Sequence, residues 1–458
     1  MSKRLRSQLV WDRVSVPATM AVAKGVTESE TEVPTFPIDL APRDQAIALL
    51  LIGAEVEHAL MVQYLYGAYS LDEEQPDEAT RQLVRHWRSV ILEIAREEMG
   101  HLATVQNLLT VIGGPLSFDR EDYPIIDPEL WPFPFQLEPL TKKSLAKYVL
   151  AEMPSQQVLK RLHLEKEIDA IVKYVEVDCL HVHRVGLIYD RITSFFTKGP
   201  IIEGPNISPF TDTHPYIATI DIQAAKVKFQ ATPDSWGLGN QRILVKTAFD
   251  RDSAIKAVQL VSTQGEGSDI ESDLEKSHFG RFLKIYRQFP DDRRVSRNIA
   301  TNPTTNPRNA DRDRQIEGSA RPWAELCNLR YRMLLTYLLH SFYVEARTDE
   351  TSRFPGAALI SWAFGEMYNI RSFSEILMRM PLQTGTDLRA GPPFEMPYSL
   401  ALPHHSDDRW RMHRDLLLAS ISMLGEMVSE SGSHETFLRA LRTADETALQ
   451  QINALIGA

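Results

Sequence analysis

Apolar residues recur every three or four positions through most of the chain, the spacing that places them on one face of an α-helix. Two such runs come first, Ala46 to Leu71 and Ala79 to Ile112. A polar turn at residues 72–77 joins them, and Gly113-Gly114-Pro115 ends the second. A turn this short makes the two predicted helices antiparallel neighbours. The pattern predicts a helical bundle that begins with this pair.

Helical spacing returns further along the chain, between segments rich in proline and glycine. The predicted helices are Ser144 to Met153, Gln156 to Phe196, Ser253 to Gln264, Glu271 to Phe289, Trp323 to Arg347, Pro355 to Met380, Asp408 to Glu430 and His434 to about Leu455. The predicted fold class is therefore all-α. We divide the chain into an extended N-terminal arm (1–38), a bundle with proline-rich insertions (39–290), a polar linker (291–321) and a helical C-terminal region packed on the bundle (322–458).

The composition narrows the functional classes. Of the 458 residues 43% are hydrophobic and 24% charged, as in ordinary globular proteins, and the net charge of −11 argues against nucleic-acid binding. Cys179 and Cys327 stand outside any CxxC or CxxCH motif, so neither a disulfide framework nor an attached c-type haem is indicated. We find no secretory signal and no uncharged apolar stretch long enough to span a bilayer. We expect a soluble, cytoplasmic protein without nucleic-acid or membrane partners.

Two Glu-x-x-His motifs, each preceded by a further glutamate, carry the candidate chemistry. The six residues are Glu57, Glu98, His101, Glu266, Glu275 and His278. Glu98 and His101 lie three residues apart in an apolar run, so on a helix both point toward the same packed interior. The order Glu, ExxH, Glu, ExxH is typical of a four-helix bundle that binds two metal ions.

The expected burial of these carboxylates indicates metal ions. Each unpaired carboxylate in a core would cost several kcal/mol, and two divalent ions would supply the compensating charge. Oxygen and imidazole ligands without thiolate favour iron or manganese over copper or structural zinc. We predict two iron ions, with manganese or a mixed iron and manganese pair as alternatives. By analogy with other ExxH sites, Glu98 and Glu275 are the expected bridging ligands.

Neighbouring residues compete for places in this site. Glu55 lies two positions before Glu57 and so points from a different face of the helix. We prefer Glu57 because it shares a stripe with Met61 and Tyr64. Tyr64 is either a core residue or a catalytic side chain that could carry a radical beside an oxidising metal.

A further group with ligand spacing lies between the two motifs. It comprises Glu176, Asp178 and His181. We favour a structural role for these residues, although one of them could take the place of Glu266 in the site.

Several short sequence stretches together indicate a protein family. They are Glu57-His58-Ala59, Gln63-Tyr64-Leu65-Tyr66, Glu97-Glu98-Met99-Gly100-His101-Leu102, Gln264-Gly265-Glu266-Gly267 and Ser277-His278-Phe279-Gly280-Arg281-Phe282. In these stretches the chain resembles the ferritin-like domain of the iminophenyl-pyruvate dimer synthase family, which contains the violacein and rebeccamycin pathway enzymes that couple amino-acid-derived imines. The resemblance implies a ferritin-like bundle and a metal-dependent oxidative enzyme of natural product biosynthesis. Some family members are described as haem proteins, so haem stays open as a cofactor.

We therefore expect a non-haem dimetal oxidase or oxygenase that uses O2 or peroxide on a small, amino-acid-derived substrate. A ferroxidase or a peroxide-removing protein without an organic substrate is the alternative. Arg281, one turn after His278, would either bind a substrate carboxylate or pair with a carboxylate of the bundle. A homodimer is one option for the assembly.

The substrate pocket is expected to be apolar and aromatic. A proline-rich loop at residues 115–139 would form its wall or lid, because helix is excluded there by the prolines. The predicted lining residues are Met61, Tyr64, Trp131, Phe133 and Phe135.

Overall fold

The structure is a computed structural model of the chain. It describes residues 5–15, 30–38, 40–128, 130–176, 184–197, 217, 221–236, 243–266, 274–291, 295–309, 311–344, 355–396, 400–428 and 432–456. The chain divides into two compact units. Unit 1 consists of Met1–Gln136 and Leu140–Ser296, and unit 2 of Leu137–Pro139 and Arg297–Ala458.

Unit 1 is helical apart from one small sheet, within the described residues. Its elements are strands β1 (Val10–Ser15) and β2 (Glu30–Thr35), helices α3 (Pro42–Ser70), α4 (Glu78–Val111), α5 (Lys142–Ala151), α6 (Gln156–Arg161), α7 (Glu165–Val175), α8 (Arg184–Phe196), α9 (Pro233–Trp236), α10 (Arg251–Glu266) and α12 (His278–Gln288), and the 3-10 helix η3 (Ala224–Phe229). The predicted all-α class is confirmed.

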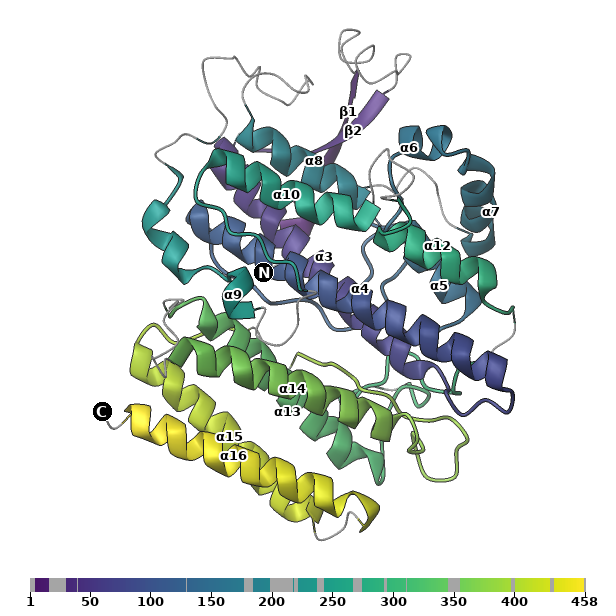
Figure 1. Ribbon diagram of the computed structural model, residues 1–458, viewed down its shortest axis with the longest axis vertical. Coiled ribbons are helices and arrows are strands. Elements are labelled where there is room, and N and C mark those ends of the chain that lie inside the picture. Colours follow the sequence, from purple (N-terminus) through teal and green to yellow (C-terminus); the bar gives the residue numbers. More distant parts are fainter. Residues whose placement is uncertain are drawn as a thin grey trace. The chain divides into compact units, whose positions relative to one another are not determined.

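Helices α3 and α4 form the long antiparallel pair that the sequence predicted (Figure 1). Helices α8 and α10 pack on one half of the pair, and α5 and α12 on the other half (Figure 1). The tight contacts follow this division: Gly53 of α3 faces Tyr189 of α8, and Gly67 faces Tyr148 of α5. The middle of α3 and α4 therefore lies where all these helices meet, and this is the level of Glu57 and Glu98.

Local sequence signals explain where α4 and α12 begin. Asp77 caps α4 by accepting hydrogen bonds from the backbone N–H groups of Ala79 and Thr80. Ser277 caps α12 by accepting from the N–H of Gly280. A Cβ at Gly280 would lie 1.9 Å from the carbonyl oxygen of Leu274, so only glycine allows the turn before α12 to fold back this closely.

The cap at Ser277 changes one predicted helix. We predicted one helix from Glu271 to Phe289, but α12 begins at His278, and Glu275 lies in the turn before it. The segment predicted as mostly helical from Gln156 to Phe196 is likewise divided into α6, α7 and α8. Left-handed backbone at His163 (φ 57°) and Glu176 (φ 64°) ends the first two of these helices.

Helix α3 is apolar enough, by length and composition, to cross a membrane, which the sequence reading did not expect. In the structure 83% of its apolar window is buried among other parts of the chain. The central helix of a globular core passes the same test of length and composition, so this feature is weak evidence for a membrane span.

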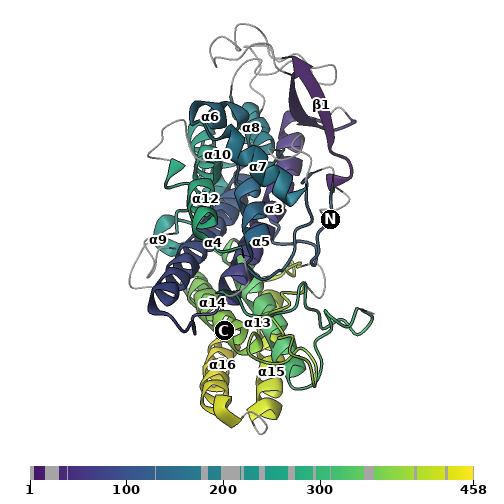
Figure 2. The same ribbon diagram turned by 90° about the vertical axis from the view of Figure 1, so that its right-hand side faces the viewer.

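The N-terminal arm contains a hairpin that lies at one end of unit 1 in both ribbon views (Figures 1 and 2). Strand β1 pairs antiparallel with β2, with Val10 opposite Thr35. Before the hairpin, Arg6 is buried and forms ion pairs with Glu55, Glu121 and Asp127. The arm is therefore anchored to the bundle by charge.

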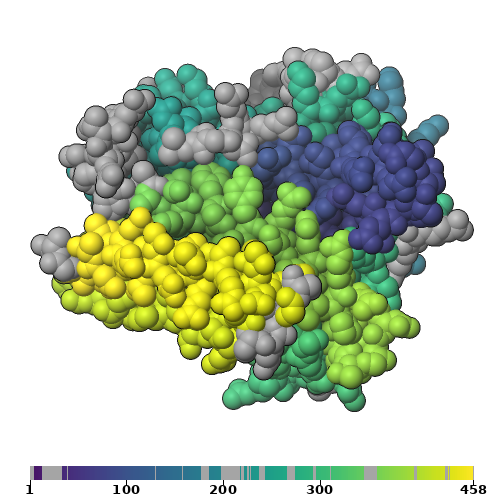
Figure 3. Space-filling view, turned by 60° about the horizontal axis from the view of Figure 1, so that its bottom comes forward, coloured from purple at the N-terminus to yellow at the C-terminus, as the bar shows by residue number. Residues whose placement is uncertain are grey.

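In its described residues, unit 2 has four long helices, α13 (Ala320–Ser341), α14 (Pro355–Leu377), α15 (Ser406–Val428) and α16 (Glu435–Ile456), with the 3-10 helix η5 (Gly432–His434) before the last. Trp323, Phe373, Leu424 and Leu438, one from each helix, share its core. Helix α16 lies on the surface of the unit (Figure 3), and its buried positions recur at helical spacing. The prediction of four C-terminal helices agrees with these elements.

Candidate metal centre

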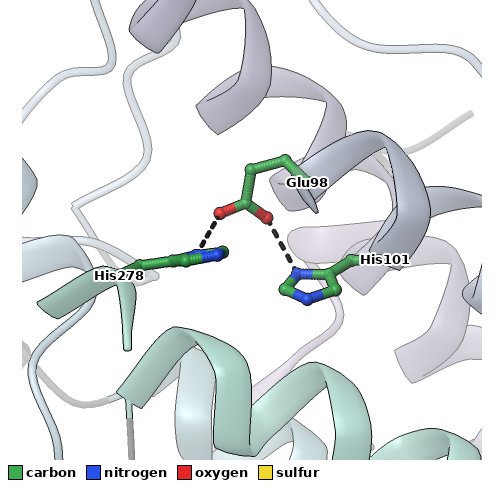
Figure 4. Close-up of side chains that lie close together, drawn as sticks. All are labelled: Glu98, His101 and His278. Atoms are coloured by element: carbon green, nitrogen blue, oxygen red, sulfur yellow. Dashed lines mark hydrogen bonds and ion pairs between the residues drawn. The ribbon is translucent and has the colours of Figure 1, made fainter. Parts of the chain in front are cut away.

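Glu98 lies between two histidines in the interior of unit 1 (Figure 4). Its Oε2 is 3.0 Å from Nδ1 of His101, and its Oε1 is 2.7 Å from Nδ1 of His278. All three residues are buried, and their candidate ligand atoms lie within 4.8 Å of one another. Helix α4 supplies Glu98 and His101 one turn apart, and α12 supplies His278 as its first residue. A carboxylate with one oxygen toward each imidazole has the placement of a bridging ligand.

Two more carboxylates flank this group, one beside each histidine. Glu57 Oε2, from α3, is 3.3 Å from Nδ1 of His101. Glu152 Oε2, directly after α5, is 3.6 Å from Nδ1 of His278. The centre thus has two matched halves, each with one histidine and one outer glutamate, which share Glu98.

Each outer glutamate accepts a hydrogen bond from a buried tyrosine. The hydroxyl of Tyr189, on α8, donates to Glu57. The hydroxyl of Tyr64, on α3, donates to Glu152 at 2.5 Å. Burial, reinforced by the nearby carboxylates, raises the pKa of both tyrosines well above its ordinary value, so both keep their protons.

The outward-facing nitrogen of each histidine has its own partner. His101 Nε2 lies 2.9 Å from Gln264 Oε1, in the last turn of α10. His278 Nε2 lies 2.8 Å from Glu97 Oε2, and Glu97 is paired with Arg281. Since each Nε2 can donate to an oxygen, each imidazole in its neutral form presents the lone pair of Nδ1 toward the centre. Outer partners fix metal-binding histidines in this way.

The charges of the centre favour bound cations. Burial lowers the pKa of His101, but the carboxylates of Glu98 and Glu57 outweigh it and raise the pKa to about 10. The pKa of His278 is raised well above its ordinary value, because Glu98 and the other nearby carboxylates outweigh burial. Burial and the charge of Glu98 raise the pKa of Glu57 to about 7. The side chains alone therefore hold protons, with which a metal ion would compete.

The donor atoms fit a pair of metal ions. Glu98 Oε1 and His278 Nδ1 are buried close together, yet neither makes a hydrogen bond of acceptable geometry. Buried polar atoms without such a bond are costly and rare. Three carboxylates and two imidazoles, without a thiolate, are ligands that suit iron or manganese.

The chain was compared with known protein families. The family described as Ferritin-like matches residues 50–287, just over half of the sequence. The chain is a ferritin-like protein. The matched range contains both halves of the candidate centre, and it confirms the ferritin-like fold expected from the sequence motifs.

Two curated relatives of this ferritin-like protein are biosynthetic enzymes by name. It is 24% identical over 395 residues to dichlorochromopyrrolate synthase of Lentzea aerocolonigenes, covering 78% of this chain and 36% of the relative. It is 27% identical over 298 residues to 2-imino-3-(indol-3-yl)propanoate dimerase of Chromobacterium violaceum, covering 58% of this chain and 25% of the relative. These matches agree with the family resemblance stated from the sequence. The chain spans about a third or less of each relative's length.

A solved structure is also similar to the chain. It is a ferritin-like protein from Caulobacter vibrioides, 16% identical, with a TM-score of 0.41. The match covers 72% of this chain and 98% of that one.

The second predicted ExxH motif does not form as expected. Glu275 is exposed in the turn before α12, whereas His278 is buried within the helix. The three-residue spacing puts two side chains on one face only inside a helix, and the Ser277 cap lies between these two. The expectation that Glu275 is a bridging ligand is corrected by this placement, and Glu152 is the carboxylate that lies beside His278.

The two alternatives for the first ligand, Glu55 and Glu57, differ in the side chains with which they pair. Glu57 lies in the centre, while Glu55, although buried, is paired with Arg6 of the arm. Glu176 is exposed and lies 3.6 Å from Lys143, so it is not part of the group. The side chain of Glu266, together with Asp178 and His181, lies outside the described residues.

The sequence patterns did not predict four residues of the centre. They are Glu97, Glu152, Tyr189 and Gln264. Glu152 gave one usable signal, because it is a charged residue near the end of the apolar helix predicted from Ser144 to Met153. Glu97 and Gln264 stand inside the stretches that carry the family resemblance. Tyr189 gave no signal, since a tyrosine in an apolar run is ordinarily a core residue.

Tyr64 and Arg281 were the two predicted catalytic side chains. Tyr64 is completely buried and lies against Glu152. Arg281 pairs with Glu97, which is the second of the two contacts expected for it. The geometry assigns both residues to support of the centre rather than to contact with a substrate.

A small apolar cavity lies beside the centre. It is lined by Leu60, Leu130, Trp131, Pro132, Phe133, Phe135, Leu150, Ala151 and Val185, and its volume of about 10 Å³ has room for one water-sized molecule. The three predicted aromatic loop residues line it, but Met61 and Tyr64 do not. Ala151, which lines the cavity, directly precedes Glu152 in the chain.

Proposed function

We propose that this protein is a dimetal oxidase or oxygenase, with iron as the expected metal, that acts on a small amino-acid-derived molecule. The observation that carries the proposal is the buried group of three carboxylates and two imidazoles around Glu98, in which Glu98 Oε1 and His278 Nδ1 make no hydrogen bond of acceptable geometry. Two iron ions held there would supply reaction with O2 or peroxide. The names of the two relatives support an amino-acid-derived substrate and a place in natural product biosynthesis.

The protein's own residues have distinct tasks in this proposal. Glu98 would contribute to holding both ions, Glu57 and His101 to holding one of them, and Glu152 and His278 to holding the other. Tyr189 and Tyr64 hold the outer carboxylates by hydrogen bonds and keep a proton on each hydroxyl oxygen. The stacked rings of Trp131 and Phe135, with centroids 4.2 Å apart, give the cavity an apolar wall.

The alternative function is oxidation of iron or removal of peroxide without an organic substrate. The size of the cavity supports this alternative, because about 10 Å³ holds one water-sized molecule and excludes an indole-sized molecule. An organic substrate therefore requires the loop at residues 130–135 to open. Oxygen uptake by reduced protein separates the two functions: dependence on an added amino-acid-derived substrate supports the first, and substrate-independent turnover supports the second.

The metal content tests the centre itself. Protein purified after iron supplementation should hold two ions per chain, and Glu98→Ala should lose both, because each half uses this carboxylate. Glu275→Ala is the matched control: it removes the exposed glutamate that the sequence motif implicated, and it should keep both ions. Less than one ion per chain in the unaltered protein, or two ions in Glu98→Ala, would contradict the proposal.

A further inference from the structure

The two halves of the centre have matched inner residues but different outer partners. Behind His278, Nε2 donates to a carboxylate oxygen of Glu97 at 2.8 Å. Behind His101, Nε2 donates to the neutral amide oxygen of Gln264 at 2.9 Å. The two distances are nearly equal, so the halves differ in the charge of the acceptor rather than in the length of the hydrogen bond.

Glu97 is held in place by a second contact. Arg281 Nη1 lies 3.3 Å from Glu97 Oε1, and Arg281 Nη2 pairs with the other oxygen. Glu97 adjoins Glu98 on α4, and Arg281 follows His278 by one turn on α12. The pair therefore ties together the two helices that supply the central ligands. Both side chains are mostly buried, at 14% and 17% exposure, so solvent screens the pair only in part.

A carboxylate acceptor makes an imidazole a stronger metal ligand than an amide acceptor does, because it draws the N–H proton away and leaves more electron density on the other nitrogen. Loss of such an outer partner changes metal affinity by about 10- to 100-fold. We propose that Glu97, positioned by Arg281, makes the His278 half bind its metal ion more tightly than the Gln264-backed His101 half. The two ions then load in a fixed order, with the His278 half first. This inference rests on the dimetal centre of the proposed function.

Exchange of the two outer partners tests the order. The metal-free full-length protein is titrated with Mn²⁺, and free Mn²⁺ is followed by its electron paramagnetic resonance signal, so enzyme activity is not needed. The unaltered protein should bind two ions in steps separated by about tenfold or more. Glu97→Gln should weaken the first step by about 10- to 100-fold, and Gln264→Glu should tighten the second. The double exchange should reverse the order of loading.

The half that fills first is assigned by removing one histidine at a time. His101→Ala should keep the tight step, and His278→Ala should lose it. Two exposed residues on the same helices serve as matched controls: Glu78→Gln on α4 removes an ion pair with Arg81, and Gln259→Glu on α10 adds a charge. Neither control should change either step.

The outcomes separate this inference from the proposed function. Two ions of equal affinity in the unaltered protein, or a first step unchanged in Glu97→Gln, would overturn the ordered loading and leave the dimetal centre intact. No bound metal in the unaltered protein would overturn both. If Glu97→Gln does not fold, Gln264→Glu alone decides, because an unchanged second step in that variant contradicts the role of the outer partner.

Discussion

The two units bury carboxylates in opposite ways. In unit 1, three central carboxylates face two histidines, whose protons can leave and be replaced by metal ions. In unit 2, Glu366 and Asp445 face a buried arginine, Arg330, whose Nη1 lies 2.8 Å from an oxygen of each. Arginine stays protonated at any physiological pH. The charge that neutralises the carboxylates around Arg330 is permanent, and the charge that neutralises the carboxylates of the metal centre can be exchanged.

The permanent charge also joins the helices of unit 2. Arg330 comes from α13, Glu366 from α14 and Asp445 from α16, and Arg330 Nη2 lies 2.8 Å from Ser420 Oγ on α15. Four helices therefore meet at one guanidinium. Buried acids with a fixed cation hold a structure together, whereas buried acids with exchangeable protons leave room for chemistry.

Removal of the fixed cation should strongly destabilise unit 2. Arg330→Met leaves the buried carboxylates of Glu366 and Asp445 without a neutralising cation, which costs about 3–5 kcal/mol of unfolding free energy. Urea denaturation measures the loss. Arg371→Met is the control, because Arg371 pairs with Glu375 on the exposed face of α14 and should change stability little.

A second variant separates the destabilisation caused by unpaired buried charge from the destabilisation caused by lost contacts. When Glu366→Gln and Asp445→Asn are added to Arg330→Met, the cluster no longer contains a buried charge, and much of the lost stability should return. A triple variant that is less stable than Arg330→Met would show that the contacts themselves, rather than the charge balance, stabilise unit 2.

Metal ions should stabilise unit 1 and leave unit 2 unchanged. Ions that bind only the folded centre contribute about 2.7 kcal/mol at a free concentration 100 times the dissociation constant. Hydrogen exchange measures this unit by unit: protection should rise in α3, α4 and α12 when Fe²⁺ is added without oxygen, and stay constant in α13 to α16. Equal protection gains in both units would contradict the contrast between exchangeable and permanent charge.

The sequence predicted one half of the centre better than the other, for a physical reason. Glu57, Glu98 and His101 lie on two long helices, and a helix converts spacing along the chain directly into a shared face. His278 was also predicted, but its supposed partner Glu275 was not brought to the centre. The serine cap that starts α12 is a local signal in the sequence, but the prediction gave more weight to the repeated Glu-x-x-His motif.

The places of Glu152 and Tyr189 in the centre could not be predicted from spacing along the chain. Glu152 reaches the centre because α5 ends beside it, and Tyr189 because α8 crosses α3 at Gly53. Such contacts depend on which helices meet and at what level. Unit 2 shows the same limit: its four helices follow from periodicity, but the meeting of Arg330 with Asp445, 115 residues away, does not.

Acid should weaken unit 2 through a buried pair of histidines. His340 Nδ1 lies 2.9 Å from His413 Nε2. Burial and the charge of Arg409 lower the pKa of His340 to about 3, and burial with His340 lowers that of His413 well below its ordinary value. In the unfolded chain both would take up protons below about pH 6.5. Stability should therefore fall as the pH drops from about 6.5 toward 3, by about 1.4 kcal/mol per pH unit for each proton bound on unfolding. Urea denaturation at a series of pH values measures the slope, and His404→Gln, at an exposed histidine, should leave it unchanged.

Two helical glycines give the smallest and most local comparison. A Cβ at Gly265 of α10 would lie 3.0 Å from Glu152 Oε2, whereas a Cβ at Gly365 of α14 would meet nothing within 4 Å. Alanine favours a helix over glycine by up to about 1 kcal/mol, so Gly365→Ala should stabilise unit 2 by about that amount. In Gly265→Ala the same gain is opposed by the contact with Glu152, and stability should change by less than about 1 kcal/mol. The displaced carboxylate should nevertheless weaken metal binding in the His278 half, which the Mn²⁺ titration would detect. Unaltered metal affinity in Gly265→Ala would show that Glu152 can move without consequence, and would count against it as a ligand.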